Sequence, residues 1–145
     1  MCLPAKHLKV KTSTIPQSGK GLFVAVDVPR GAMITEYVGR RATWADVEDD
    51  ADNPYIYYID DDNVIDASND LKSFGRYAND AAGLTRVPGL KNNAEYEEEG
   101  HRVFIKAKAP IAAGSEVFVA YGKDYWKQVR ENIKIDVARK KKAAK

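Results

Sequence analysis

The sequence predicts a mostly β domain, and three observations lead to that class. Short runs such as HLKVKTSTI (7–15) and LFVAVDV (22–28) alternate apolar with polar residues and are rich in β-branched side chains. Glycine and proline turns separate these runs at short intervals. Long helices do not alternate with the strands, which argues against a doubly wound parallel sheet. The 145 residues are enough for one domain with its own core.

The first strands are expected at 7–15, 22–28 and 33–39, in that order. PQSGKG (16–21) joins the first two as a loop. PRGA (29–32) turns the chain into the third, because proline and glycine favour turns.

The middle of the chain combines a short helix with a hairpin. Thr43 is a suitable N-cap for a helix within 42–54, and Pro54 is expected to break that helix. YIYYID (55–60) and NVIDA (63–67) predict a hairpin across the two aspartates between them.

The last third begins irregularly and ends in strands. SNDLKSFGRYANDAAG (68–83) is expected to be irregular or weakly helical, and TRVPGLKN (85–92) to be a loop. NAEYEE (93–98) and HRVFIKAKAPI (101–111) predict two strands, and the alternation of 117–121 predicts a third, half-buried one.

Tyr121 closes that strand directly before Gly122, where glycine permits a sharp change of direction. A tyrosine at this place can present its hydroxyl to a cleft or simply pack. Beyond it, 123–140 predicts an amphipathic helix, because apolar residues recur there at a spacing of four. These residues are Tyr125, Val129, Ile133 and Val137.

Charge is distributed unevenly along the chain. Residues 46–70 carry ten acidic side chains and no Lys or Arg, and Glu95–Glu99 adds a second acidic cluster. Residues 127–145 carry a net charge of +6. Such runs can simply be solvated surface. Two acidic runs on one small domain also favour a basic partner such as a lysine-rich peptide. The tail RKKKAAK can contact nucleic acid or an acidic surface or be a disordered end, and we favour a disordered end.

Composition excludes several classes of protein and site. One cysteine, Cys2, excludes an internal disulfide and a cysteine-rich zinc site. His7 and His101 show no metal spacing, so no metal site is expected. We expect no membrane span and no signal peptide, and hence an intracellular protein. Gly19-Lys20-Gly21 is too short for a nucleotide-binding fingerprint and is by itself a turn.

Four segments, taken together and in order, resemble the SET-domain protein lysine methyltransferases in a minimal form without cysteine-rich flanks. Each segment is weak evidence alone, but their order and spacing are specific. They span roughly residues 8–126 and are Gly19-Lys20-Gly21-Leu22-Phe23, Glu36-Tyr37-Val38-Gly39, Ile65-Asp66-Ala67 with Arg76-Tyr77-Ala78-Asn79, and Glu116 through Gly122.

This resemblance implies a fold of small curved sheets with a knot-like core, followed here by the expected C-terminal helix. We therefore divide the chain into a SET-type domain at 1–126 and a helix with a basic tail at 127–145. The family transfers a methyl group from S-adenosylmethionine to a lysine nitrogen. Lysine must first become neutral, which costs roughly 4–5 kcal/mol at pH 7. A dry aromatic channel lowers that cost and guides the incoming cation.

By resemblance, Tyr121 is the catalytic tyrosine at the methyl-transfer point, where it positions the reacting groups. Tyr37 and Tyr96 are implied to line the lysine channel. For each of these three tyrosines the alternative is ordinary aromatic packing.

The resemblance also implies a set of cofactor-binding residues for S-adenosylmethionine. The resemblance implies that backbone groups of the glycine motif and the side chain of Asn79 contact this cofactor. It also implies that an aromatic residue after the Tyr-Gly turn covers the adenine. The full set is Lys20, Gly21, Leu22, Arg76, Asn79, Asp80, Tyr121 and Trp126.

Two positions depart from the family pattern. Asp80 stands where the family has histidine, and Val119 stands where an aromatic residue often influences the number of methyl groups added. Asp80 keeps a rival hypothesis open, in which the chain is a catalytically silent SET-like module that binds basic peptides.

We expect the substrate to be a lysine-rich protein, such as a histone or another DNA-associated protein. The location would then be the nucleus or chromatin, and otherwise the cytoplasm. The sequence leaves open the oligomeric state and contact of the basic tail with nucleic acid.

Overall fold

The computed structural model describes residues 2–50, 53, 55–70, 73–82 and 86–121. Within these ranges the chain forms three small antiparallel sheets of three strands each, with strand orders β1-β2-β9, β3-β8-β7 and β4-β6-β5. The strands are β1 (Leu8–Thr12), β2 (Lys20–Val24), β3 (Met33–Tyr37), β4 (Arg40–Ala42), β5 (Ile56–Asp60), β6 (Asn63–Asp66), β7 (Ala94–Glu99), β8 (Arg102–Ala107) and β9 (Glu116–Val117). The expected mostly β fold of small sheets is confirmed.

Helical segments within the described residues are short. They are η1 (Ala5–His7), α1 (Trp44–Val47), η2 (Glu48–Asp50) and η3 (Gly75–Tyr77). Thr43 is the N-cap of α1 as expected, and its backbone N–H donates to the Asp46 carboxylate at 3.1 Å.

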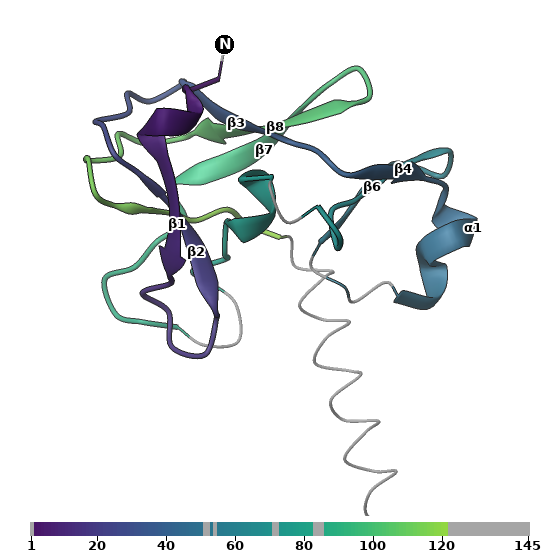
Figure 1. The fold of residues 1–145 in the computed structure, drawn as a ribbon, viewed down its shortest axis with the longest axis horizontal. Coiled ribbons are helices and arrows are strands. Elements are labelled where there is room, and N and C mark those ends of the chain that lie inside the picture. The colour runs from purple at the N-terminus through teal and green to yellow at the C-terminus, as the bar shows by residue number, and fades with distance from the viewer. Residues whose placement is uncertain (1, 51–52, 54, 71–72, 83–85, 122–145) are drawn as a thin grey trace, which may run out of the picture.

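The sheets are arranged so that sequence-distant segments meet in the middle of the molecule. β1 and β2 lie on one side of the view in Figure 1, β4 and β6 lie on the other, and η3 lies between them. Two isolated parallel bridges, Asn79↔Phe118 and Ala94↔Val119, join the segment after β9 to residues far earlier in the chain.

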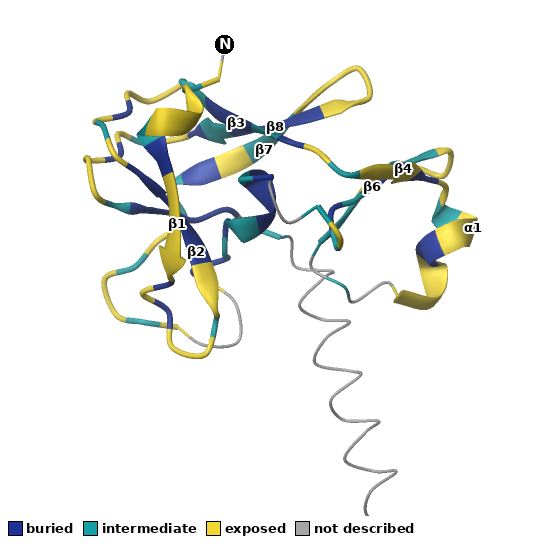
Figure 2. Ribbon diagram, in the orientation of Figure 1, coloured by how far each residue is buried: buried dark blue, intermediate teal, exposed yellow. Residues whose placement is uncertain are grey.

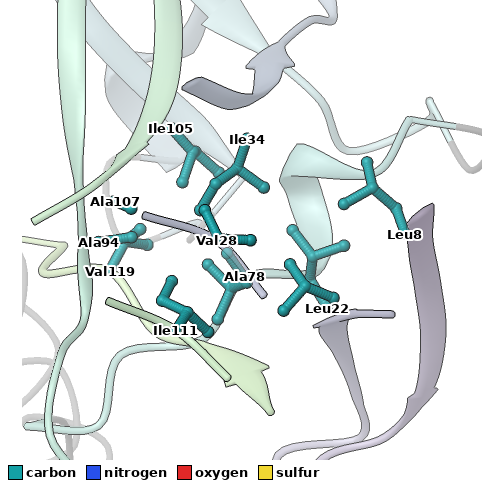
Figure 3. Packing of buried hydrophobic residues seen from close by; sticks show 12 residues of the cluster. Leu8, Leu22, Val28, Ile34, Ala78, Ala94, Ile105, Ala107, Ile111 and Val119 are labelled. Carbon is teal, nitrogen blue, oxygen red and sulfur yellow. The ribbon is translucent and has the colours of Figure 1, made fainter. Parts of the chain in front are cut away.

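The buried residues of the main hydrophobic core come from two stretches of the chain, 8–34 and 78–119. Figure 3 shows Leu22, Ile34, Ile105 and Val119 packed together. Figure 2 shows the contrast between this buried interior and β1, which is exposed along most of its length. The core thus holds the ends of β2, η3 and β9 against one another.

The hairpin expected at 55–67 forms as β5 and β6, with Tyr58 opposite Val64. The last strand was predicted wrongly. β9 covers only Glu116–Val117, and residues 116–119 are all buried rather than alternating. The reason is that Phe118 and Val119 lie between segments on two sides, through the bridges to Asn79 and Ala94. A segment that is enclosed on both sides has no face toward solvent, so its residues do not alternate between buried and exposed.

The expected helix at 123–140, Trp126 and the basic tail lie outside the described residues. Among the residues that are described, no helix has the length and apolar character needed to cross a membrane.

Candidate functional site

Three tyrosines from three strands form one ring cluster, which we call the tyrosine cluster. Tyr37 ends β3, Tyr57 lies in β5 and Tyr96 lies in β7. The ring centroids of Tyr57 and Tyr96 are 5.0 Å apart, and those of Tyr37 and Tyr96 are 5.8 Å apart with an edge-to-face angle of 88°. Such arrangements are favourable for aromatic pairs. The structure therefore brings together both tyrosines that the sequence assigned to the substrate, and adds Tyr57.

The surroundings of the tyrosine cluster disfavour charge. Burial raises the pKa of the Tyr37, Tyr57 and Tyr96 hydroxyls above the ordinary value, and burial is the largest cause for each. For Tyr96, the nearby Tyr121 hydroxyl is the next cause. All three phenols therefore remain neutral at physiological pH, and Tyr121 lies close to the cluster.

Tyr121 is held at both its backbone and its side chain. Its hydroxyl donates to the carbonyl oxygen of Ala78 at 2.6 Å. Its backbone N–H donates to the Asp80 carboxylate at 3.0 Å. Because the hydroxyl proton is used toward Ala78, the lone pairs of its oxygen are oriented to accept from another group.

Asp80 is a buried carboxylate that joins three segments of the chain. Its Oδ1 accepts from the backbone N–H of Ala82 at 2.8 Å and from the Asn92 side chain at 3.0 Å, while its Oδ2 accepts from the backbone of Tyr121. The aspartate in place of the family histidine thus takes part in positioning the last segment.

Asn79 lies beside the glycine motif. Its side-chain nitrogen donates to the carbonyl oxygen of Lys20 at 3.0 Å and lies 3.4 Å from the Glu116 carboxylate. Its backbone carbonyl accepts from Val119 at 2.8 Å. The sequence-predicted residues Lys20, Gly21 and Asn79 are therefore brought together.

Glu116 is a second buried carboxylate, with only 4% of its surface exposed. The hydroxyls of Ser13 and Thr14 donate to its two oxygens at 2.7 Å, and the backbone N–H of Thr14 donates at 2.8 Å. A side chain on Gly21 would collide with its Oε2 and approach its Cδ to 2.8 Å. A Cβ at position 21 would therefore force the Glu116 carboxylate to shift.

The remaining predicted cofactor residues have other surroundings. Arg76 is buried, donates to the carbonyl oxygen of Ser68 at 3.0 Å, and lies 4.2 Å from the centre of the Tyr55 ring. The Leu22 side chain lies in the core, which leaves only its backbone for a ligand. Trp126 lies outside the described residues.

Sequence reasoning missed the roles of Tyr57 and of the Glu116 side chain. Tyr57 is one of five aromatic or aliphatic residues in YIYYI, and its strand position alone does not show which ring it meets. Its pairing with Ile65 places it on the same side of the hairpin as that buried residue. The cross-strand register of the expected hairpin was therefore the available signal.

The groups gathered at the glycine motif are mainly acceptors. They include the Lys20 carbonyl, which accepts from the Asn79 side-chain nitrogen, and the Glu116 carboxylate, which accepts from Ser13. Within the described part of the chain, no basic side chain pairs with Glu116. This chemistry fits a ligand that carries positive charge, and S-adenosylmethionine has both an ammonium and a sulfonium.

Comparison with curated proteins found no match. Among solved structures, the chain is similar to the methyltransferase domain of human PR domain-containing protein 2. The TM-score is 0.60 with 23% sequence identity, over 81% of this chain and 78% of that one. That likeness concerns the fold. The family model for the SET domain matches residues 19–122, which is most of the chain. This chain therefore belongs to the SET-domain family.

Proposed function

We propose that this protein transfers a methyl group from S-adenosylmethionine to a lysine side chain of a basic protein. The observation that carries the proposal is the position of Tyr121 next to the tyrosine cluster, whose surroundings disfavour charge. Membership of the SET family supplies the reaction class.

The tyrosine cluster suits the first requirement of the reaction, which is a neutral amine. The same desolvation that raises the pKa of Tyr37, Tyr57 and Tyr96 would lower that of a lysine ammonium placed beside them. The ring faces attract the ammonium before it loses its proton. The cluster would therefore both admit the lysine and favour its reactive form.

Tyr121 suits the second requirement, which is alignment. Its hydroxyl is fixed by the Ala78 carbonyl and its backbone by Asp80, so its oxygen points in a defined direction. An oxygen held in this way can accept a hydrogen bond from the incoming amine and orient its lone pair. Alignment of this kind supplies much of the catalysis of a simple displacement.

The cofactor, when bound, supplies a methyl group on a positively charged sulfur. Backbone groups of Lys20 and Gly21 and the side chain of Asn79 would hold it, since these groups lie together.

The acidic surface near the tyrosine cluster favours a basic substrate. The Tyr57 hydroxyl donates to Glu98 at 3.0 Å, which connects the cluster to the exposed glutamates of β7. Asp60, Asp61 and Asp62 are also exposed at the β5–β6 turn. A lysine-rich protein such as a histone fits these charges, and a nuclear location would follow from that substrate.

The decisive experiment is transfer of labelled methyl from S-adenosylmethionine to a panel of basic proteins that includes histones. Wild type should label one of them, and Tyr121→Phe should lose most of the label while retaining cofactor affinity. Tyr58→Phe is a matched control, because Tyr58 is exposed and its hydroxyl bonds to Asp61 in the hairpin turn. No label together with no cofactor binding would favour the silent peptide-binding module instead.

Charge reversal tests the substrate class. Replacing Glu95, Glu98 and Glu99 with lysine should raise the Michaelis constant for a basic substrate about tenfold at low salt, because exposed charges steer association. The effect should fade as ionic strength rises, since salt screens exposed charges. An unchanged Michaelis constant at low salt would discard the acidic surface as a substrate contact.

A further inference from the structure

Glu116 is a buried carboxylate to which neither the family resemblance nor the proposed mechanism gives a role. It lies in β9, pairs with Phe23 of β2, and is almost completely buried. Its side chain reaches across the sheet to the Ser13–Thr14 turn, 103 residues earlier in the chain. A residue in this position can serve only as a structural tie, or it can also act through its charge.

Neutral donors surround the Glu116 carboxylate. Its two oxygens accept from hydroxyl or amide groups of Ser13, Thr14 and Asn79, and donors of this kind stabilise the ionised form of a carboxylate. All these donors are neutral. The described residues therefore leave a buried negative charge that is solvated by hydrogen bonds but not neutralised by a cation.

The charge lies at the glycine motif. The Asn79 side-chain nitrogen lies between the Lys20 carbonyl and the Glu116 carboxylate, at 3.0 Å and 3.4 Å. Gly21 approaches the same carboxylate so closely that a Cβ at this position would displace it. Any ligand held by Lys20, Gly21 and Asn79 would therefore bind in the field of Glu116.

We propose that Glu116 makes the cofactor site selective for the positively charged cofactor over its neutral-sulfur product. This proposal rests on the proposed function. In the reaction, the bond from sulfur to the methyl carbon breaks and its electron pair stays on sulfur. A neutral lysine nitrogen forms the new bond to carbon and afterwards releases a proton to solvent. The ligand at the glycine motif thus loses one positive charge.

A buried carboxylate attracts a cation more strongly than a neutral group, because the interior screens charges less than water does. The charge of Glu116 would therefore strengthen the binding of S-adenosylmethionine more than the binding of S-adenosylhomocysteine. The consequence is weaker retention of the product, which is the species that must leave before the next turnover.

The test compares the dissociation constants of the two nucleosides by calorimetry, without any turnover. Wild type should bind S-adenosylmethionine more tightly than S-adenosylhomocysteine. Glu116→Gln should reduce that preference by about fivefold, chiefly through weaker binding of the charged ligand. Ser13→Ala keeps the charge but removes one donor, so it should leave the ratio unchanged even if both affinities fall.

Asp27→Asn is the matched control. Asp27 is exposed, and like Glu116 it accepts a hydrogen bond from a residue far away in the sequence, the backbone N–H of Ala113, 86 positions later. It should leave both affinities as in wild type. An analogue with an ammonium in place of the methylated sulfur provides a test in wild type alone. It should bind more tightly than S-adenosylhomocysteine, which keeps the proposal testable if Glu116→Gln fails to fold.

Three results would overturn the inference. They are equal affinities of wild type for charged and neutral ligands, an unchanged ratio in folded Glu116→Gln, and a ratio that Ser13→Ala shifts as much as Glu116→Gln does. If wild type binds no nucleoside at all, the proposed function fails together with this inference. If it binds both without preference, only the role of Glu116 fails.

Discussion

The tyrosine cluster and the two buried carboxylates lie in the same small domain but are stabilised in opposite ways. In the cluster, apolar rings contact one another, and a hydroxyl takes a single partner at the edge of its ring, as when the Tyr37 hydroxyl donates to the Tyr55 carbonyl at 2.6 Å. At Asp80 and Glu116, the polar group is at the centre and accepts from several distant segments.

This difference separates two kinds of contribution to a functional site. Ring contacts contribute mainly through buried area, so removal of a ring should reduce stability. A carboxylate that joins several segments fixes their relative positions. Removal of such a carboxylate should therefore reduce the turnover rate, through a change in site geometry, more strongly than it reduces the free energy of unfolding.

The largest expected loss of stability is for Tyr96→Ala. Tyr96 contacts both other rings of the tyrosine cluster and packs against two core clusters. Truncation should lower the free energy of unfolding by about 3 kcal/mol, as for other buried aromatic residues. Urea unfolding measures this loss. Tyr58→Ala is the matched control, since Tyr58 is 49% exposed, and a loss as large as that of Tyr96→Ala would refute the distinction.

A smaller loss of stability, with a larger change in turnover, is expected for Asp80→Asn. The amide must place a donor where the carboxylate accepts from Tyr121, Ala82 or Asn92. We expect a loss of about 2 kcal/mol, the cost of an unsatisfied buried group. The methyl-transfer rate should fall more than cofactor affinity does.

Asp80→His would restore the family residue and sharpens the same comparison. An imidazole cannot accept from all three donors, so this variant should also be less active than wild type. Activity above that of wild type would mean that Asp80 lowers the activity of the site instead of positioning Tyr121 for it.

The smallest effect at neutral pH is expected for Tyr37→Phe, which leaves the rings in place. Loss of the hydrogen bond to Tyr55 should cost about 1 kcal/mol. The difference between wild type and variant should then decrease in alkali. Burial raises the pKa of Tyr37 in the folded chain. Above pH 10, the ordinary pKa of tyrosine being about 10, the unfolded chain loses the Tyr37 proton while the folded chain keeps it.

This contribution to stability is complete below that ordinary value and is lost as pH rises toward the raised pKa of the folded state. Urea unfolding between pH 8 and pH 11 should therefore show a steeper decline for wild type than for Tyr37→Phe. Parallel declines would contradict the burial of this hydroxyl.

Local features of the fold were predictable from the sequence because their causes are local. Thr43 as an N-cap and the β5–β6 hairpin depend on residues within a few positions of each other. The prediction for residues 117–121 was wrong because their burial depends on Asn79 and Ala94, which no local pattern reveals.

The candidate site follows the same division. Motif resemblance named Tyr37, Asn79 and Tyr121, whose roles stay predictions. The function of a side chain such as Glu116 depends on which donors surround it, and these come from residues 13, 14 and 79. Only the folded chain brings those donors together.

The long span between Ser13 and Glu116 also has a consequence for how the protein is made. Contacts between such distant residues form late in folding, because closing a long loop costs entropy before any contact rewards it. During synthesis, Ser13, Thr14 and Asn79 emerge from the ribosome well before their shared partner does. The nascent chain would therefore have an open glycine motif until residues 116–121 arrive, and this period is when it is most exposed to misfolding.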